Sequence, residues 1–236
     1  MDRSEATARL LCAVDTTDLD QARALAQQLT GHVGALKLGL EFFCAHGPDG
    51  ISQVTDGKHG LFLDLKLHDI PNTVAGGLRG MAPIRPFLTT IHASGGPAMM
   101  RAAMAAAHDL GEARPKVVAV TMLTSMDDDD VEAVGMRGPV SDQVLRLADL
   151  VQACEVDGVV CSALETERLR KHCGEDFLLV VPGIRPAWAA SDDQKRIMTP
   201  GEAMAGGASY LVVGRPITTA DDPAAAADGI SAEMAG

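Results

Sequence analysis

The sequence has few aromatic side chains, and this scarcity limits how its core can be built. Phenylalanine, tyrosine and tryptophan make up 3% of the 236 residues, whereas hydrophobic residues of all kinds make up 47%. The apolar volume must therefore come from alanine, valine, leucine, isoleucine and methionine, which suits a parallel sheet covered by helices. A chain of this length is enough for one large core, so we expect residues 1–236 to form a single domain.

The sequence also lacks an excess of basic residues. Its formal net charge is −12 at pH 7. Nucleic acids and anionic membranes bind to basic surfaces, so this charge argues against both kinds of partner. A small anionic substrate is compatible with it, because such a substrate needs only a local basic pocket.

Disulfide, targeting and membrane signals are absent as well. No CxxC pair occurs among the cysteines, which we interpret as reduced thiols of a cytosolic protein. The first residues, 1–5, are polar and acidic, unlike a signal peptide. No apolar run approaches the roughly 20 residues that a membrane span needs. We therefore expect a soluble, cytoplasmic protein. The five cysteines are Cys12, Cys44, Cys154, Cys161 and Cys173.

What the sequence does contain is a series of short apolar runs separated by alanine-rich helical patterns. Strands that alternate with helices indicate βαβ units and a parallel sheet. Eight such units in a chain of this length predict an α/β fold, a (β/α)₈ TIM barrel. An open, doubly wound sheet is the alternative, which is less favoured because no GxGxxG follows the first run. The eight runs are 10–15, 34–40, 61–67, 87–93, 116–123, 158–163, 177–183 and 210–215.

Helical patterns fill the segments between these runs. They cover residues 18–29, 96–110, 141–154 and 166–173, and the tail 221–236 is expected to form a short final helix. The acidic run 127–130 precedes an apolar stretch. Acidic residues are favoured at a helix start by the helix dipole, so we interpret this run as a solvated helix N-terminus rather than a metal site.

Polar residues recur where the predicted strands end. Active sites of (β/α)₈ barrels lie at the C-terminal ends of the strands. A polar side chain at one strand end is unremarkable, but the same pattern on several strands is hard to explain by maintenance of the fold. The residues in question are Asp15, Lys37, Asp64, Lys66, Asp69, His92, Thr124, Arg185 and Arg215, with Gly214 just before the last of them.

The third run carries the densest group of charges. Side chains two apart on a strand share a face, so Asp64 and Lys66 are expected to project together. Asp69 follows just before Pro71, which is expected to end the strand. These residues form either a structural ion pair at a strand end or part of a site. With Lys37 they alternate in sign, and each opposite neighbour favours the charged form. A cationic proton donor beside fixed anions suits a reaction that leaves a carbanion.

The ends of the last two runs predict a phosphate site, the usual place for one in this fold. Gly214 lets a backbone N–H approach an anion closely, and Arg215 adds a bidentate positive charge. Arg185 and the polar loop 191–196 are expected to close over the anion, since that loop is long enough to act as a lid. The alternative is a C-capping glycine beside a surface arginine.

Residues 64–73 resemble the DxKxxDIPxT signature of the orotidine 5′-phosphate decarboxylase family. The resemblance covers essentially the whole chain. It implies decarboxylation of orotidine 5′-phosphate to UMP in de novo pyrimidine synthesis, without a metal or cofactor. The further segments that look like motifs of this family are 36–39, 92–96, 120–125, 182–186, 193–196 and 213–217.

The resemblance also implies roles for individual residues. Lys66 would donate a proton to C6 of the pyrimidine, with Asp64, Asp69 and Lys37 completing the catalytic group. Asp69 and Thr73 would cross a homodimer interface into the neighbouring site. Arg185, Gln194, Gly214 and Arg215 would bind the phosphate, Asp15 would hold the ribose or base side, and Thr124 would lie near the substrate. The residues expected to bind substrate are Asp15, Lys37, Asp64, Leu65, Lys66, Leu67, His68, Asp69, Ile70, Pro71, Asn72, Thr73, Thr124, Arg185, Gln194, Gly214 and Arg215.

Two other functions compete with this interpretation. A related barrel enzyme, such as 3-keto-L-gulonate 6-phosphate decarboxylase, shares the DxKxxD core but uses Mg²⁺. The continuation at residues 70–73 and the loop around Gln194 favour the orotidine family instead. A catalytically silent phosphate-binding barrel is the other alternative, and the complete set of lysines and aspartates argues against it.

Overall fold

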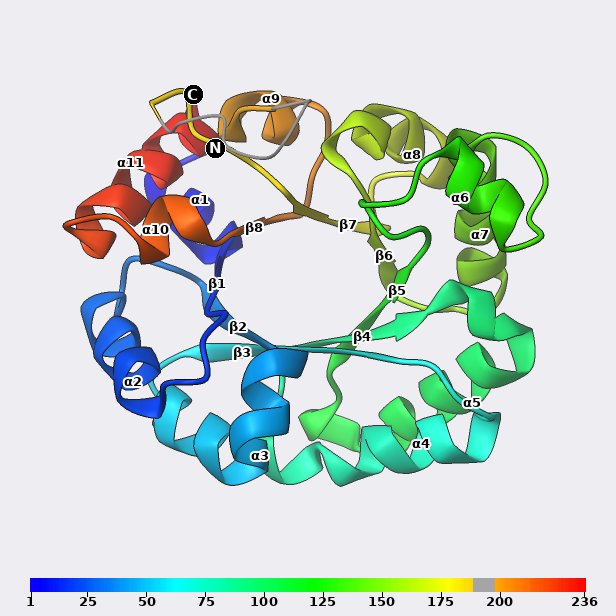
Figure 1. Ribbon diagram of the computed structural model, residues 1–236, viewed down its shortest axis with the longest axis horizontal. Coiled ribbons are helices and arrows are strands. Elements are labelled where there is room, and N and C mark those ends of the chain that lie inside the picture. Colours follow the sequence, from blue (N-terminus) through cyan, green and yellow to red (C-terminus); the bar gives the residue numbers. More distant parts are fainter. Residues whose placement is uncertain (189–197) are drawn as a thin grey trace.

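The computed structural model describes residues 1–188 and 198–236. Within these ranges, parallel strands pair in chain order from β1 to β8, and β1 also pairs with β8, which closes a barrel. Figure 1 shows the helices arranged as a ring around the strands. The (β/α)₈ barrel predicted from the apolar runs is therefore confirmed.

The strands are short, as expected for a barrel interior that only a few side chains fill. They are β1 (Leu10–Ala13), β2 (Ala35–Gly39), β3 (Gly60–Leu67), β4 (Leu88–His92), β5 (Lys116–Val120), β6 (Gly158–Val160), β7 (Leu178–Pro182) and β8 (Tyr210–Val213). The helices are α1 (Arg3–Arg9), α2 (Leu19–Gln28), α3 (Leu40–Thr55), α4 (Pro71–Gly80), α5 (Gly96–Asp109), α6 (Asp128–Ala133), α7 (Val140–Ala153), α8 (Thr166–Cys173), α9 (Pro200–Ala205), α10 (Arg215–Thr218) and α11 (Pro223–Ala235).

Several strands end earlier than their apolar runs do. The run 116–123 continues three residues past Val120, the last residue of β5, and the run 158–163 continues past Val160. Val120 and Val160 are also the last residues of these strands that pair with a neighbour. Beyond β5, Met122 and Leu123 line a cavity at the barrel mouth, whereas Cys161, beyond β6, is buried in the apolar layer next to the helices.

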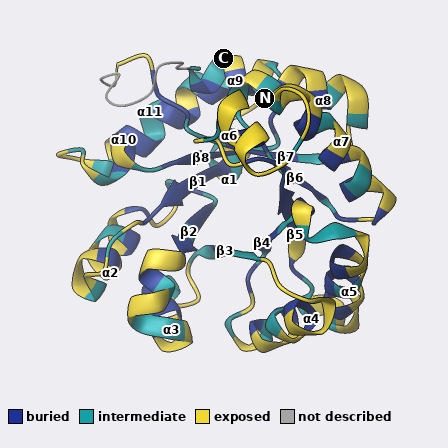
Figure 2. Cartoon of the chain, turned by 45° about the vertical axis from the view of Figure 1, so that its right-hand side comes forward, coloured by how far each residue is buried: buried dark blue, intermediate teal, exposed yellow. Residues whose placement is uncertain are grey.

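Two apolar layers hold the barrel together. Side chains such as Leu11, Phe62 and Val118 fill the interior of the barrel. A larger layer, which includes Leu38 and Ile91, lies between the strands and the surrounding helices. Figure 2 shows this division, with buried residues along the strands and exposed residues on the outer faces of the helices. Each fully buried large aliphatic or aromatic side chain contributes roughly 1.5–3 kcal/mol to stability.

Strand β3 departs from regular pairing just before its end. Leu63 pairs with Thr89 and Leu67 pairs with Ile91, so four steps along β3 (63 to 67) match two along β4 (89 to 91). Within this bulge Lys66 has a φ of 51°, a left-handed conformation that side chains other than glycine rarely adopt. Bulges of this kind are common beside active sites, where they redirect a side chain.

The ends of the helices follow the sequence closely. Pro71 begins α4, where its missing N–H removes no helical hydrogen bond. Asp127 caps α6 by accepting a hydrogen bond from the backbone N–H of Asp130, so the helix start expected in the acidic run is confirmed. No helix in ranges 1–188 and 198–236 is long and apolar enough to cross a membrane.

Candidate active site

A cavity of about 330 Å³ lies at the C-terminal ends of the strands. Strands β2 and β3, the segments that follow β1, β5 and β7, and the start of α10 contribute its polar lining. This is the end of the barrel at which enzymes of this fold carry out their chemistry. The described polar and charged side chains of the lining are Asp15, Lys37, Asp64, Lys66, Thr124, Arg185 and Arg215.

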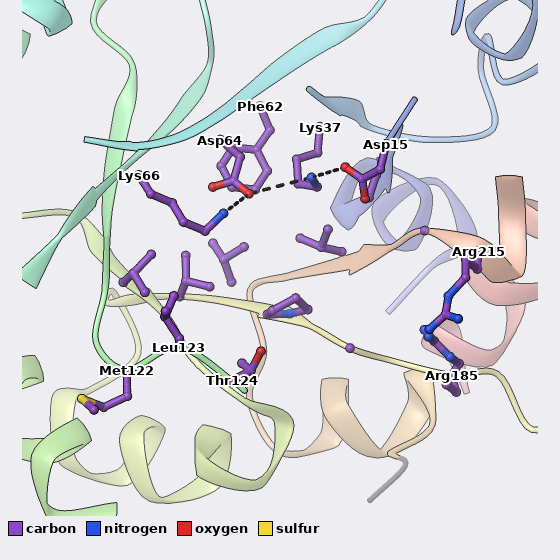
Figure 3. A pocket seen from close by; sticks show the side chains of 18 residues that line it. Asp15, Lys37, Phe62, Asp64, Lys66, Met122, Leu123, Thr124, Arg185 and Arg215 are labelled. Carbon is purple, nitrogen blue, oxygen red and sulfur yellow. Dashed lines mark hydrogen bonds and ion pairs between the residues drawn. The ribbon is translucent and has the colours of Figure 1, made fainter. Parts of the chain in front are cut away.

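One side of the cavity carries a row of alternating charges. The Nζ atom of Lys66 donates to Oδ2 of Asp64 at 2.7 Å. The Nζ atom of Lys37 lies 3.8 Å from that same oxygen and donates to Oδ1 of Asp15 at 3.0 Å. Figure 3 shows the row in the order Lys66, Asp64, Lys37 and Asp15. The structure thus brings together Asp64 and Lys66 of β3 with Lys37 of β2, and Asp15, which follows β1, lies at the end of the row.

Asp64 is the centre of this row and is buried, with 8% of its surface exposed. A buried carboxylate is costly unless it is paired and hydrogen-bonded. Besides Lys66 and Lys37, it accepts a hydrogen bond at Oδ1 from the hydroxyl of Thr90, at 2.9 Å. Both of its oxygens are therefore engaged, and this fixes the orientation of the carboxylate relative to the Lys66 ammonium.

Two arginines lie at the opposite end of the cavity. In Figure 3 the side chains of Arg185 and Arg215 extend toward each other, well away from Lys66. Arg185 follows β7, is 8% exposed, and donates from Nη1 to the carbonyl of Ile184 at 3.1 Å. Arg215 begins α10 directly after Gly214, and Gly183 and Gly214 also line this end. Two guanidinium groups beside glycine backbone form a suitable place for an anion.

An apolar wall separates the two charged ends. The described residues of this wall come mainly from the strands β5 to β8 and from the loop after β5. Leu123 remains 42% exposed, so part of this wall faces open space. The cavity is suited to a molecule with an apolar surface and an anionic group at the end near the arginines. The apolar lining comprises Ala13, Phe62, Val120, Met122, Leu123, Val160, Val180, Pro182 and Val212.

Comparison with known proteins identifies the family of this barrel. Residues 8–230 match the model of the orotidine 5′-phosphate decarboxylase / HUMPS family. The chain belongs to this family. The resemblance found in the sequence, and the enzyme class that it implies, are thereby confirmed.

Individual relatives agree with the family model over nearly the whole chain. The orotidine 5′-phosphate decarboxylase of Paramagnetospirillum magneticum is 57% identical, covering 94% of this chain and 96% of the relative. The protein of the same name from Rhodospirillum rubrum is 55% identical, covering 95% and 93%. The crystal structure of orotidine 5′-phosphate decarboxylase from Lactobacillus acidophilus is 39% identical with a TM-score of 0.86, covering 96% of this chain and 99% of that one.

The segment that carries the family signature divides into two parts. Asp64 and Lys66 line the cavity. Leu65 and Leu67 instead pack against the apolar layer beneath the helices. The six residues that follow are exposed, and the described lining of the cavity includes none of them. They are His68, Asp69, Ile70, Pro71, Asn72 and Thr73.

Asp69 is therefore apart from the charges with which the sequence grouped it. Its Oδ1 atom accepts a hydrogen bond at 2.6 Å from the backbone N–H of Ile70, at the turn into α4. Ile70 is 67% exposed, an unusual fraction for a large aliphatic side chain. At the other end of the site, Gln194 and the expected lid, 191–196, lie outside the described residues, and their roles stay predictions.

Of two further residues near the charged row, the sequence named His92 only among the polar strand ends and did not indicate Thr90 at all. Thr90 has no exposed surface, yet its hydroxyl contacts both Asp64 and the backbone of Lys66. Its signal was weak, because Thr89 and Thr90 are adjacent and either could have faced the barrel interior. His92 stacks on His68 with ring centroids 5.3 Å apart. Burial, together with the nearby His68 and Lys66, lowers the pKa of His92 below its ordinary value.

Among the described residues, no group of three or more histidine, cysteine, aspartate or glutamate side chains is placed to hold a metal ion. Cys12 lies beneath the site, and burial raises the pKa of its thiol to about 12. A thiol of this kind stays protonated, so Cys12 acts as a small apolar side chain.

Proposed function

We propose that this protein converts orotidine 5′-phosphate to UMP and CO₂ in pyrimidine biosynthesis. The observation that carries the proposal is the row of alternating lysines and aspartates, set across one cavity from two arginines. The family and the named relatives supply the substrate. The nucleotide has a phosphate at one end and a pyrimidine carboxylate at the other, which matches the two charged ends of the cavity.

In the proposed reaction the bond between C6 and the carboxylate breaks, and its electron pair remains on C6. Lys66 then donates a proton from Nζ to C6, and its amine regains a proton from water. The ammonium also stabilises the developing negative charge, as a preorganised charge does in a site that excludes water. Asp64 holds the Lys66 ammonium at 2.7 Å, and Lys37 secures Asp64 and Asp15 in turn.

The arginines have a different task, since they lie far from the bond that breaks. We assign the phosphate to Arg185, Arg215 and the backbone at Gly214, with Gln194 closing over it. Binding energy gained there can hold the pyrimidine against the charged row. Thr124 and Asp15 line the space between and are assigned to the base and the ribose.

The proposal extends to a homodimer in which Asp69 and Thr73 enter the site of the neighbouring chain. Both residues are exposed, and the cavity lining described in their own chain does not include them. The row of charges ends at Lys66, so an acidic group from a second copy would continue the alternation. The exposed Ile70 between them would be buried in the same contact. A cytoplasmic location, expected from the sequence, stays a prediction.

The decisive experiment follows the ultraviolet absorbance of orotidine 5′-phosphate after addition of the purified protein. We expect the absorbance change of conversion to UMP, at the same rate with and without EDTA. Loss of activity in EDTA would favour the activity of a metal-dependent relative. This control matters because the matched family also includes HUMPS proteins. An unchanged spectrum would exclude the proposed reaction.

A further inference from the structure

Thr90 is the described side chain that joins the two halves of the Asp64–Lys66 pair. Its hydroxyl donates to Oδ1 of Asp64 at 2.9 Å and accepts from the backbone N–H of Lys66 at 2.8 Å. Lys66 Nζ in turn donates to the other oxygen of Asp64, at 2.7 Å. The three residues therefore close a ring of hydrogen bonds. A threonine hydroxyl can serve one donor and one acceptor at once, which a residue without a hydroxyl cannot do.

The bulge in β3 explains why a hydroxyl is needed at this position. Regular pairing with β4 is interrupted between Leu63 and Leu67, so the Lys66 N–H lies outside the ladder. A buried N–H without an acceptor is costly, and Thr90 supplies that acceptor from the neighbouring strand. The same contact holds Lys66 at its left-handed φ of 51°. One side chain therefore fixes the backbone of Lys66 and, through Asp64, the direction of its ammonium.

We propose that Thr90 is a positioning residue that sets the placement of the Lys66 ammonium over C6 of the pyrimidine. This inference rests on the proposed function for its effect on turnover. Thr90 has no exposed surface and is not part of the described cavity lining, so it acts through its two partners. Its partners Asp64 and Lys66 lie at one end of the cavity, whereas Arg185 and Arg215 lie at the other (Figure 3). Its loss should therefore affect the chemical step and leave nucleotide binding nearly intact.

The chain offers a matched control on the same strand. Thr89 is equally buried, and its hydroxyl donates to the carbonyl of Leu63 at 3.0 Å. Thr89→Val and Thr90→Val each remove one buried hydroxyl from β4 and keep the side-chain shape. They differ in that only the second change touches the charged pair. Thr90→Ser keeps the hydroxyl and removes the methyl group.

The experiment measures kcat and KM for orotidine 5′-phosphate in the three variants and the wild type. We expect Thr90→Val to lower kcat on the order of 100-fold, because a displacement of about 1 Å at the reacting group has an effect of that size. KM should change little, Thr89→Val should keep the wild-type kcat, and Thr90→Ser should regain most of it. A purely structural role for Thr90 would lower the melting temperature and leave kcat per folded molecule unchanged, which would overturn the proposal.

A second readout does not depend on activity. The readout is the NMR spectrum of protein labelled with ¹³C in its lysine side chains. The signal of Lys66 is identified by its absence from the spectrum of Lys66→Arg. That signal should shift in Thr90→Val and stay in place in Thr89→Val, and an unshifted signal in both would overturn the proposal. If Thr90→Val does not fold, Thr90→Ala and Thr89→Ala replace the pair, with the same expected contrast. A wild-type protein that leaves the nucleotide unchanged would refute the proposed function alone, and the spectra would then decide on Thr90.

Discussion

Lys66 combines a strained backbone with a tightly held side chain. Its neighbours remain paired when it is removed, since Asp64 still contacts Thr90 and lies 3.8 Å from Lys37. Truncation of Lys66 should therefore separate its chemical role from its contribution to the fold.

Lys66→Ala is expected to reduce decarboxylation of orotidine 5′-phosphate almost to zero while the protein stays folded. The reason is that the proposed proton donor is gone and no cation faces C6. Steady-state assays and thermal unfolding measure the two properties. Lys58→Ala is the matched control, because Lys58 pairs with Asp56 on the surface, outside the cavity. Substantial turnover by Lys66→Ala would remove Lys66 from the role of proton donor.

His92 should make the stability of the protein depend on pH. Burial first, and then His68 and Lys66, lower its pKa, while Asp64 acts in the opposite direction. The unfolded chain therefore binds this proton at a higher pH than the folded chain does. The resulting stability is present above the ordinary histidine value of about 6.5 and is lost as pH falls toward the folded pKa.

Melting temperatures measured from about pH 7 to pH 5 test this expectation, since the histidine charge changes in this range. The wild type should lose stability on acidification, and His92→Gln should lose less. His59 is a useful comparison, because burial also lowers its pKa and it lies in a surface pocket between α2 and α3. His59→Gln should remove a separate part of the dependence of the melting temperature on pH. Identical profiles for wild type and His92→Gln would contradict the assignment.

At the scale of single elements, the strands were easier to predict from the sequence than their ends. Each apolar run overlaps one strand, because a barrel strand is buried on both faces and must be apolar. Met122 and Leu123 continue the run after β5 but line the cavity instead. Composition cannot distinguish a buried strand from an apolar loop over a cavity. The end of β5 is set by its hydrogen-bonded pairing with neighbouring strands, which the sequence alone does not show.

Only part of the charged site could be predicted from the sequence, because its geometry also depends on how the strands pair. Alternation along a strand placed Asp64 beside Lys66, and the fold class placed Lys37 near them. The bulge at Lys66 and the contact of Thr90 could not be predicted, because both depend on how β3 is paired with β4. The arginines that follow β7 and β8 were expected at a shared end, and the structure brings them there.

Strand β6 contains a position where the barrel has no room for a side chain. A Cβ added to Gly158 would lie 2.1 Å from the carbonyl oxygen of Leu178 on β7. Gly158→Ala must therefore move one strand relative to the other, and we expect a loss of about 1–3 kcal/mol in the free energy of unfolding. Urea unfolding measures it. Gly229→Ala in α11 is the control, since its Cβ would approach only Trp188, at 3.9 Å. Equal stability of the two variants would contradict the expectation.

At the scale of the whole molecule, the proposed homodimer places the exposed turn before α4 against a second copy of the chain. Lys66→Ala and Asp69→Ala proteins should each be inactive alone. Mixed under conditions of subunit exchange, they should regain activity, because a hybrid has one site with both changes and one site with neither. Differently tagged chains report the exchange. No recovery, with exchange established, would mean that Asp69 acts within its own chain.

The left-handed backbone at Lys66 also bears on how this protein can be altered by selection. A non-glycine residue in that conformation costs on the order of 1–3 kcal/mol, so the fold by itself would favour glycine at position 66. Selection of variants for heat resistance alone would favour loss of the lysine, and selection for growth without added pyrimidine would retain it. Under the proposed mechanism, thermostability and catalysis therefore impose opposite demands on position 66, and a stabilised version of the protein must gain its stability elsewhere.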